Sequence, residues 1–271
     1  MFPGIYIGDF LLPSYGMCGL IAVFAAFPFA VKRYRKITHD AFSMIFVILW
    51  AAVGAFFGMH LLFGLTNLSY WHEMFEASNF NEFLNAFANI FGGAVYYGGL
   101  ICGIAAGALS ARFQGLRLDI VSDCAAPAIP LFHGIARIGC FLAGCCYGVE
   151  WEHGITFRNS LADSANGVPR VPVQLIEAGF NLITAGVLMY IFYGTAKLRG
   201  SLLPLYLTIY SAGRFGLEFL RGDDYRGQIL GLSTSQFISI PVFIISISII
   251  LVHSKPRGHK TRKIIRNSRK R

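Results

Sequence analysis

The chain has 271 residues, of which 55% are hydrophobic and only 14% charged, and its mean hydropathy is +0.57. A soluble domain carries about 25% charged residues, so this composition excludes an ordinary soluble protein. The net charge of +9 comes from the segment 255–271, which holds nine Lys and Arg and no acid. A basic tail directly after an apolar segment is typical of a cytoplasmic anchor near anionic lipid, not of a nucleic-acid-binding surface.

Apolar runs long enough to cross a bilayer recur along the chain, without period-two alternation. A span needs about 20 mostly apolar residues, and its backbone must satisfy its own hydrogen bonds in hydrocarbon, so these runs predict helices. We predict an all-α, polytopic membrane protein with seven transmembrane helices. The predicted spans are residues 14–31, 41–63, 89–110, 120–146, 172–193, 201–220 and 235–253.

Basic residues follow the first, third, fifth and seventh predicted spans. Lys and Arg collect in cytoplasmic loops, so this distribution predicts an N-terminus outside and a C-terminus in the cytoplasm. We expect 1–254 to form a single integral membrane domain and 255–271 a basic cytoplasmic tail. The residues that follow the first, third and fifth spans are Lys32, Arg33, Arg35 and Lys36; Arg112 and Arg117; and Lys197 and Arg199.

Two of the predicted outer loops are long. Residues 64–88 mix aromatic and acidic side chains, which predicts an amphipathic helix lying in the membrane interface. Residues 147–171 are polar and contain Gly and Pro, which predicts a loop or short strands on the outer surface. Glycines of the third span favour close helix packing. Asp119 and Asp123 open the fourth span, where we expect them to face the positive end of the helix dipole.

Charged side chains within the last half of the chain indicate a functional site, because a charge inside a span is costly. Spacing groups them: Arg214 and Glu218 are four residues apart, as are His133 and Arg137, so each pair shares a helix face. The charged residues within the fourth, fifth and sixth predicted spans are Arg137, Glu177, Arg214, Glu218 and Arg221.

These charges allow two interpretations. A guanidinium grips phosphate with a planar fork of donors, so three arginines near one leaflet suit a phospholipid head group. Alternatively, Glu177 and Glu218 pair with Arg137 and Arg214 as structural ion pairs. For Arg137, which has no local acid partner in the sequence, we favour ligand binding.

Cys140, Cys145 and Cys146 fall within seven residues at the outer end of the fourth span. Their spacing is not a standard zinc pattern, and no second Cys/His pair follows at metal-site spacing. A disulfide from Cys140 to Cys145 or Cys146, burial as small apolar side chains, and a metal site or nucleophile all stay open. We expect the other cysteines, Cys18, Cys102 and Cys124, to pack in the core.

Several motifs, in order along nearly the whole chain, resemble the prolipoprotein diacylglyceryl transferase family. ARIGCFLAGCCYG, at 136–148, aligns with the family signature G-R-x-G-N-F-x-N-x-E, and YSAGRFGLEFLR, at 210–221, resembles its Y-x-x-x-R-x-x-x-E-x-x-R segment. PRVPVQLIEA, at 169–178, resembles its P-R-x-P-x-Q-L-Y-E segment. Three shorter matches are Ser14-Tyr15-Gly16, Tyr97-Gly98-Gly99 and DCAAPAIP at 123–130.

The resemblance implies an enzyme of the bacterial plasma (inner) membrane. Members transfer diacylglyceryl from phosphatidylglycerol to the lipobox cysteine thiol in the signal peptide of a prolipoprotein, and glycerol phosphate leaves. No metal, organic cofactor or nucleic acid is expected to take part, and the partners are the lipid, the precursor and the bilayer. By position, Arg137 is the expected phosphate ligand; Arg221, Tyr15, Gln174 and Glu177 are further substrate-binding residues, and Arg214 and Glu218 are catalytic ones.

This sequence departs from the family pattern at its polar positions. The Asn and Glu of the signature are Cys140 and Cys145, its second Asn is Ala143, and the His before Gly-Gly is Tyr97. The usual general base is therefore missing. We hypothesise that His133, one turn before Arg137, takes over proton transfer, with Tyr97 as a further catalytic candidate. A His bonded to a backbone carbonyl within the bundle is the plainer alternative.

Three functions remain in competition after these departures. The first is the diacylglyceryl transfer just described, which the three arginines favour. The second is a related lipid-linked transferase with a different acceptor. The third is a non-catalytic membrane protein that binds thiols or metal through Cys140, Cys145 and Cys146.

Overall fold

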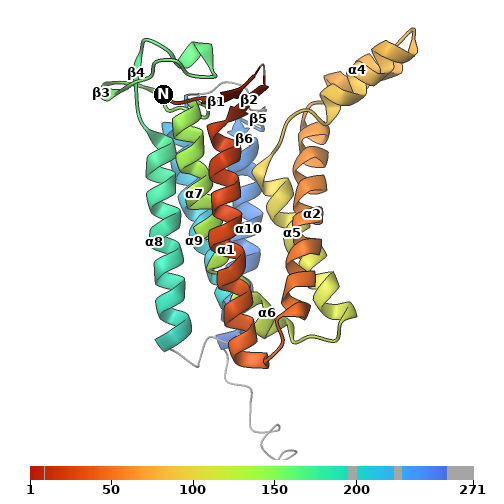
Figure 1. Ribbon diagram of the computed structural model, residues 1–271, viewed down its shortest axis with the longest axis vertical. Coiled ribbons are helices and arrows are strands. Elements are labelled where there is room, and N and C mark those ends of the chain that lie inside the picture. The colour runs from red at the N-terminus through yellow and green to blue at the C-terminus, as the bar shows by residue number, and fades with distance from the viewer. Residues whose placement is uncertain (9, 195–199, 223–227, 255–271) are drawn as a thin grey trace, which may run out of the picture.

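The computed structural model describes residues 1–8, 10–194, 200–222 and 228–254. Long helices form a bundle, and short strands and the N-terminus lie together at one end of it, which we call the strand end (Figure 1). The helices are α1 (Ser14–Thr38), α2 (Phe42–Thr66), α3 (Ser69–Phe75), α4 (Phe80–Ile90), α5 (Tyr96–Phe113), α6 (Leu118–Ala125), α7 (Ala128–Ala143), α8 (Val173–Gly194), α9 (Leu202–Leu217) and α10 (Thr234–Ser254).

Short antiparallel strands cover the strand end in three pairs. They are β1 (Gly4–Ile7) with β2 (Phe10–Pro13), β3 (Glu150–Thr156) with β4 (Pro169–Arg170), and β5 (Gln228–Ile229) with β6 (Leu232–Ser233). The β3–β4 pair confirms the strands predicted within 147–171. The β1–β2 hairpin was not predicted, because each of its strands has only four residues and neither alternates polar with apolar side chains.

In the described residues, five helical segments are long and apolar enough to cross a membrane, which makes this a multi-pass helical membrane protein. They match the first, second, fourth, fifth and seventh predicted spans. The third and sixth predicted spans are helical too, as α5 and α9, but these have 18 and 16 residues. The five segments are Ser14–Thr38, Phe42–Thr66, Leu118–Ala143, Val173–Tyr193 and Thr234–Val252.

The fourth predicted span is divided and ends early. Pro127, which has no N–H to donate, stands between α6 and α7. α7 ends at Ala143 because Gly144 has a φ of 78°, a left-handed conformation that favours glycine. The Gly144 N–H donates to the carbonyl groups of Cys140 and Phe141. The chain therefore turns at this point, and Cys145 and Cys146 lie beyond the helix.

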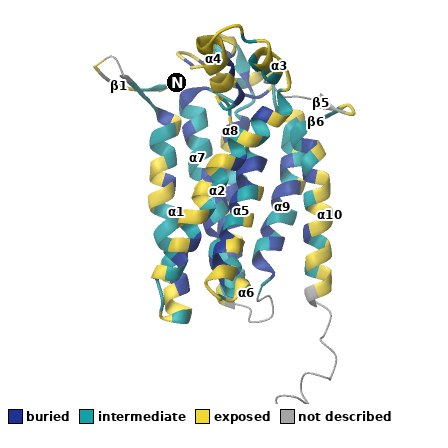
Figure 2. Ribbon diagram, turned by 90° about the vertical axis from the view of Figure 1, so that its right-hand side faces the viewer, coloured by how far each residue is buried: buried dark blue, intermediate teal, exposed yellow. Residues whose placement is uncertain are grey.

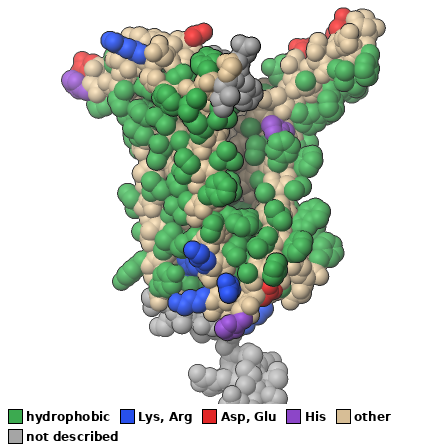
Figure 3. Space-filling view, viewed as in Figure 1, with side chains coloured by type: hydrophobic (Ala, Val, Ile, Leu, Met, Phe, Trp, Pro, Cys, Tyr) green, Lys and Arg blue, Asp and Glu red, His purple; other side chains and the backbone are tan. Residues whose placement is uncertain are grey.

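Large apolar side chains are exposed along the bundle, while several polar ones are buried inside it (Figures 2 and 3). Phe24, Phe57 and Ile183 are more than 60% exposed, whereas Glu177 is fully buried. In water such a surface would mark an aggregation hazard. In a bilayer, lipid tails solvate the exposed apolar side chains. The buried ionised groups are kept away from the hydrocarbon, where a charged side chain is costly.

Close contact between α2 and α5 confirms the packing predicted for the glycines of the third span. A Cβ at Gly58 would lie 2.4 Å from the Gly98 carbonyl oxygen, so only glycine allows the two backbones to approach this closely. Tyrosines dominate the core beside this pair: Tyr97, Tyr206 and Tyr210 are all buried in one cluster.

Residues 64–88 form two short helices where one was predicted. α3 ends at Phe75, and α4 begins after Asn79, whose side chain accepts from the Glu82 N–H while Glu82 accepts from the Ser78 N–H. This reciprocal capping starts a new helix. α4 extends away from the bundle at the strand end (Figure 1), with the exposed apolar side chains Phe80, Leu84 and Phe87.

The two aspartates at the start of the fourth span behave differently from each other. Asp119 lies in the first turn of α6, as predicted, and pairs with Arg117 at 2.6 Å. Asp123 is buried and accepts from the N–H groups of Gly200 and Leu202, at 2.6 and 3.1 Å. The dipole prediction for Asp123 is thus wrong, because its carboxylate caps the start of α9. The basic tail, Lys197 and Arg199 lie outside the described residues.

Candidate functional site

An ion pair between Arg137 of α7 and Glu177 of α8 lies at the centre of the buried polar cluster. Arg137 Nε is 3.0 Å from Glu177 Oε2, and Arg137 Nη2 donates to Oε1 at 3.2 Å. The carboxylate is fully buried, and the arginine side chain is 11% exposed. Arg137 therefore has an acid partner on the neighbouring helix, which is the ion pair that the second interpretation of the sequence offered. Its role in ligand binding stays a prediction.

Glu177 also joins two other predicted site residues to Arg137. His133 Nε2 lies 3.5 Å from Glu177 Oε1, and Arg221 Nη1 lies 3.8 Å from Oε2. His133 is one turn before Arg137 on α7, whereas Arg221 follows the short 3₁₀ helix η3 (Glu218–Leu220) at the end of α9. One carboxylate thus gathers cationic groups from two separate parts of the chain.

Arg214 and Glu218 form the second ion pair of the cluster, as their spacing predicted. Arg214 Nη2 is 2.7 Å from Glu218 Oε2, and both side chains are less than 10% exposed. The same nitrogen donates to Ser235 Oγ of α10 at 3.0 Å. The described cluster thus brings three guanidinium groups and two carboxylates together.

The two proposed proton-transfer residues lie deep in the bundle. The His133 ring stacks on Tyr96, with centroids 4.1 Å apart, and also contacts Tyr210. Tyr97 is 1% exposed, and its hydroxyl lies 2.5 Å from Ser239 Oγ. His133 is therefore placed to orient Glu177, and Tyr97 to join α5 to α10. Their roles as bases stay predictions.

Gln174 and Tyr15 occupy different surroundings. Gln174 is fully buried, and its Nε2 donates to the Cys145 carbonyl oxygen at 2.7 Å, so it fixes the turn after α7. The α1 backbone at Tyr15 lies against Gly139, where a Cβ would come within 2.8 Å of the Tyr15 Cα. The Tyr15 side chain is half exposed and makes no hydrogen bond to the described residues.

The three clustered cysteines lie together as free thiols, as do the other three, and all six are in the described part of the chain. Of the alternatives that the sequence left open, the disulfide from Cys140 to Cys145 or Cys146 is therefore not formed. The Sγ atoms of Cys140, Cys145 and Cys146 lie within 4.8 Å of one another. Hydrogen bonds from the thiols of Cys140 and Cys145, followed by the charges of Arg137 and Arg221, hold the pKa of the Cys146 thiol well below its ordinary range.

Several residues around the site were not identified from the sequence. Tyr96, Tyr210 and Ser235 touch His133 or Arg214, but isolated aromatic and hydroxyl residues in an apolar helix carry no spacing signal. Arg170 could have been found, since it belongs to the PRVP segment. It is buried over the Tyr147 ring and donates to the Ser164 carbonyl, so it holds the 147–171 loop together.

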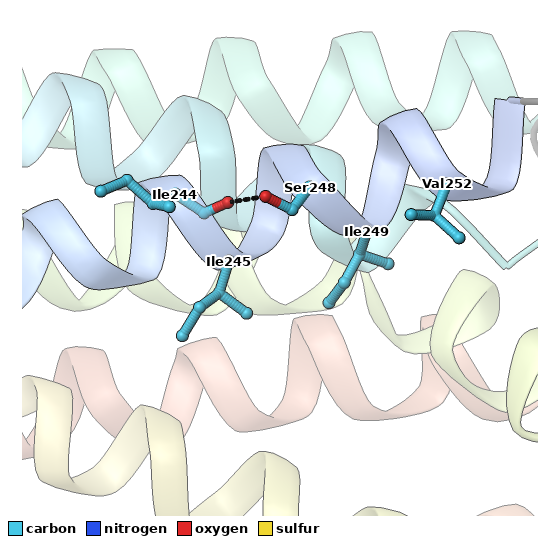
Figure 4. Close-up of a pocket in the computed structure, with 5 residues that line it drawn as sticks. All are labelled: Ile244, Ile245, Ser248, Ile249 and Val252. Carbon is cyan, nitrogen blue, oxygen red and sulfur yellow. Dashed lines mark hydrogen bonds between the residues drawn. The ribbon is translucent and has the colours of Figure 1, made fainter.

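A hollow on the outward face of α10 has a different character (Figure 4). Its one polar side chain, Ser248, donates its hydroxyl to the Ile244 carbonyl oxygen of the same helix at 2.6 Å. The other side chains that line it are aliphatic. The lining residues are Ile244, Ile245, Ser248, Ile249 and Val252.

The fold and the site together define a class: a multi-pass membrane protein with a buried arginine cluster near one end of its helices. Comparison with known proteins gives the particular family. The prolipoprotein diacylglyceryl transferase family model matches residues 4–252, and the chain belongs to that family.

Similar proteins cover nearly the whole chain. A phosphatidylglycerol–prolipoprotein diacylglyceryl transferase 2 of Clostridium perfringens is 36% identical over 255 residues, which are 91% of this chain and 93% of the relative. The enzyme of Clostridium tetani is 32% identical, covering 88% of this chain and 92% of its own length. That of Geobacter sulfurreducens is 30% identical, with 89% and 90% covered. The match confirms the resemblance found in the motifs.

Proposed function

We propose that this protein transfers the diacylglyceryl group of phosphatidylglycerol to the lipobox cysteine thiol of prolipoproteins. The acceptor sulfur forms a bond to the glycerol carbon that carries the phosphate ester. The bond between that carbon and the ester oxygen breaks, and glycerol phosphate leaves with the electron pair. The thiol proton must be lost before or during attack. The names of the relatives and the family match support this activity.

The observation that carries the proposal is the buried set of Arg137, Arg214 and Arg221. Charge grows on the phosphate as glycerol phosphate leaves, and fixed guanidinium groups in a site of low dielectric constant stabilise it without reorganisation. Glu177 and Glu218 hold the first two side chains in place. The ion pairs and the phosphate-binding role are compatible, because a guanidinium that pairs with a carboxylate along one edge still has N–H groups on its other edge.

We place the protein in the bacterial plasma membrane as a seven-span protein, with the N-terminus outside and the C-terminus in the cytoplasm. In this topology α5 and α9 complete the membrane domain of residues 1–254. The strand end then faces outward, where prolipoprotein signal peptides present their lipobox. The basic residues Lys32, Arg35 and Lys36, at the opposite end of α1 from the strands, support this orientation.

A transfer assay tests the proposal. Purified protein is mixed with phosphatidylglycerol labelled in its acyl chains and a lipobox peptide, and the lipidated peptide is measured. We expect lipidation of a Cys peptide and none of a matched Ser peptide. Lipid binding without transfer would refute this function and favour another acceptor.

A further inference from the structure

The turn after α7 brings the thiols of Cys140, Cys145 and Cys146 together in space. In an extended chain, Cys140 and Cys145 would be far apart. The left-handed Gly144 reverses the chain, and the Cys145 N–H donates to the Cys140 carbonyl oxygen at 3.2 Å. Cys146 also has a positive φ, 58°, which a residue with a side chain rarely adopts. The backbone is therefore bent sharply at the place that brings the three sulfurs together.

Buried neighbours hold this turn on three sides. Gln174 donates to the Cys145 carbonyl oxygen, and Ser160 Oγ donates to the Gly144 carbonyl oxygen at 2.8 Å. Gly148, two residues beyond Cys146, pairs with Arg221 as an isolated β-bridge. The thiol cluster is thus part of a built structure and is joined directly to one of the site arginines.

The geometry and charge of the cluster suit a thiophilic metal ion. A tetrahedral ion with Zn–S bonds of about 2.3 Å places its sulfur ligands about 3.8 Å apart. The three Sγ atoms already lie within 4.8 Å of one another, so small side-chain rotations close the gap. Three thiolates on a divalent ion leave a charge of about −1, and the charges of Arg137 and Arg221 act on this cluster.

We propose that Cys140, Cys145 and Cys146 bind one Zn²⁺ ion through three thiolates, leaving its fourth position for the acceptor thiol. Catalytic zinc sites have this form, three protein ligands and one open position. Three thiolates alone complete the coordination of Cu⁺, so a Cu⁺ ion would not bind the acceptor thiol at a fourth position. The proposal rests on the proposed transfer reaction, and it offers an alternative to His133 and Tyr97 for activating the acceptor thiol.

The acceptor thiol binds Zn²⁺ as thiolate, and its proton passes to water. The sulfur then uses an electron pair to form the S–C bond to the diacylglyceryl carbon. The C–O bond breaks towards oxygen, and glycerol phosphate leaves as an anion against Arg137. The thioether product is neutral and a weak zinc ligand, so it departs and the open position returns.

Metal binding is tested first on the full chain, kept reduced in detergent. We expect one zinc per chain to survive dialysis in the unmodified protein and in Cys102→Ser, and none in the triple variant Cys140→Ser, Cys145→Ser, Cys146→Ser. Co²⁺ in place of zinc should give thiolate-to-cobalt absorption that changes with a Cys lipobox peptide and not with a Ser peptide. Three results would overturn the proposal. The triple variant could retain as much zinc as the unmodified protein, or the unmodified protein could retain Cu⁺ but no zinc. The cobalt spectrum could also stay the same when the Cys peptide is added.

The pH dependence of transfer is the second test, made on the unmodified protein after a chelator so that folding of a variant is not at issue. A free thiol with a pKa of about 8.5 is only about 3% ionised at pH 7, so removal of zinc should lower the rate about 30-fold there and make it rise with pH. Added zinc should restore a flat profile. Identical profiles with and without zinc would refute metal activation and leave the transfer function standing.

The failure of the transfer function and the failure of the zinc site give different results. If the zinc-loaded protein binds the peptide thiol but never lipidates it from phosphatidylglycerol, the transfer function fails and the metal site stands. If the triple variant folds, as judged by retained phosphatidylglycerol binding, and transfers at the unmodified rate, the metal inference fails alone.

Discussion

Replacing Arg137 by Met tests whether this side chain holds the structure, the lipid, or both. The change leaves the fully buried Glu177 carboxylate without the guanidinium that lies 3.0 Å from it. Breaking a buried ion pair costs about 3–5 kcal/mol. His133 and Arg221 still face the same carboxylate at 3.5 and 3.8 Å, so we expect a loss near the lower end, about 3 kcal/mol.

The double variant Arg137→Met, Glu177→Gln separates the two roles. It removes both charges, so the formal charge of the cluster returns to that of the unmodified protein and most of the lost stability should be recovered, with a coupling energy of about 2 kcal/mol. The phosphate ligand is still missing, so transfer should not recover. Unfolding in detergent gives the stability, and lipidation of a lipobox peptide gives the activity.

Two results would refute this reasoning about Arg137. Unchanged stability of the single variant would mean that the ion pair does not hold α7 to α8. A stable double variant with unmodified turnover would mean that Arg137 does not bind the phosphate. Arg137→Lys is the matched control: it keeps the charge but loses the planar fork, so it should retain more stability than activity.

The remaining predictions concern other helix contacts. Tyr97→Phe should keep transfer and lose about 1 kcal/mol of stability, because the hydroxyl bonds Ser239; loss of transfer with a stable fold would instead make Tyr97 catalytic. Asp123→Ala should cost about 0.5–2 kcal/mol through the cap of α9, measured by unfolding, and an unchanged midpoint would contradict the capping role. Gly58→Leu should prevent α2 from packing on α5, seen as loss of folded protein, whereas Gly179→Ala, with open space around it, should be harmless.

Helix positions and one ion pair were predictable from the sequence because they depend on residues that are close to one another along the chain. Apolar runs of span length located the long helices, although α1 ends seven residues beyond its predicted span and α5 begins seven residues after the start of its own. A four-residue spacing indicated the Arg214–Glu218 pair. The pairing of Arg137 with Glu177 was offered only as an alternative, since it joins residues 40 positions apart. Nothing in a single sequence states which of several buried acids a given arginine faces.

The sequence did not predict where the backbone leaves a helix although the residues that follow are still apolar, nor which contacts join residues far apart in the chain. The fourth span was extended to residue 146 because Cys145 and Cys146 are apolar enough to continue it, yet the chain leaves the helix at Gly144. Asp123 was assigned to its own helix dipole because the approach of Gly200, 77 positions later, has no local signal. A metal site at the three cysteines stayed only one of several open alternatives, because their spacing in the sequence matches no standard zinc pattern.

The cysteines and the arginines of this site are linked through one short stretch of chain. Arg137 and Cys140 lie on the last turns of α7, and Arg221 is held by the β-bridge to Gly148 that closes the Cys145–Cys146 turn. A change in the turn therefore moves a phosphate-binding side chain as well as the thiols. Each cysteine substitution must for this reason be judged by lipid binding as well as by transfer: loss of both indicates a displaced Arg221, and loss of transfer alone indicates that the thiols act on the acceptor.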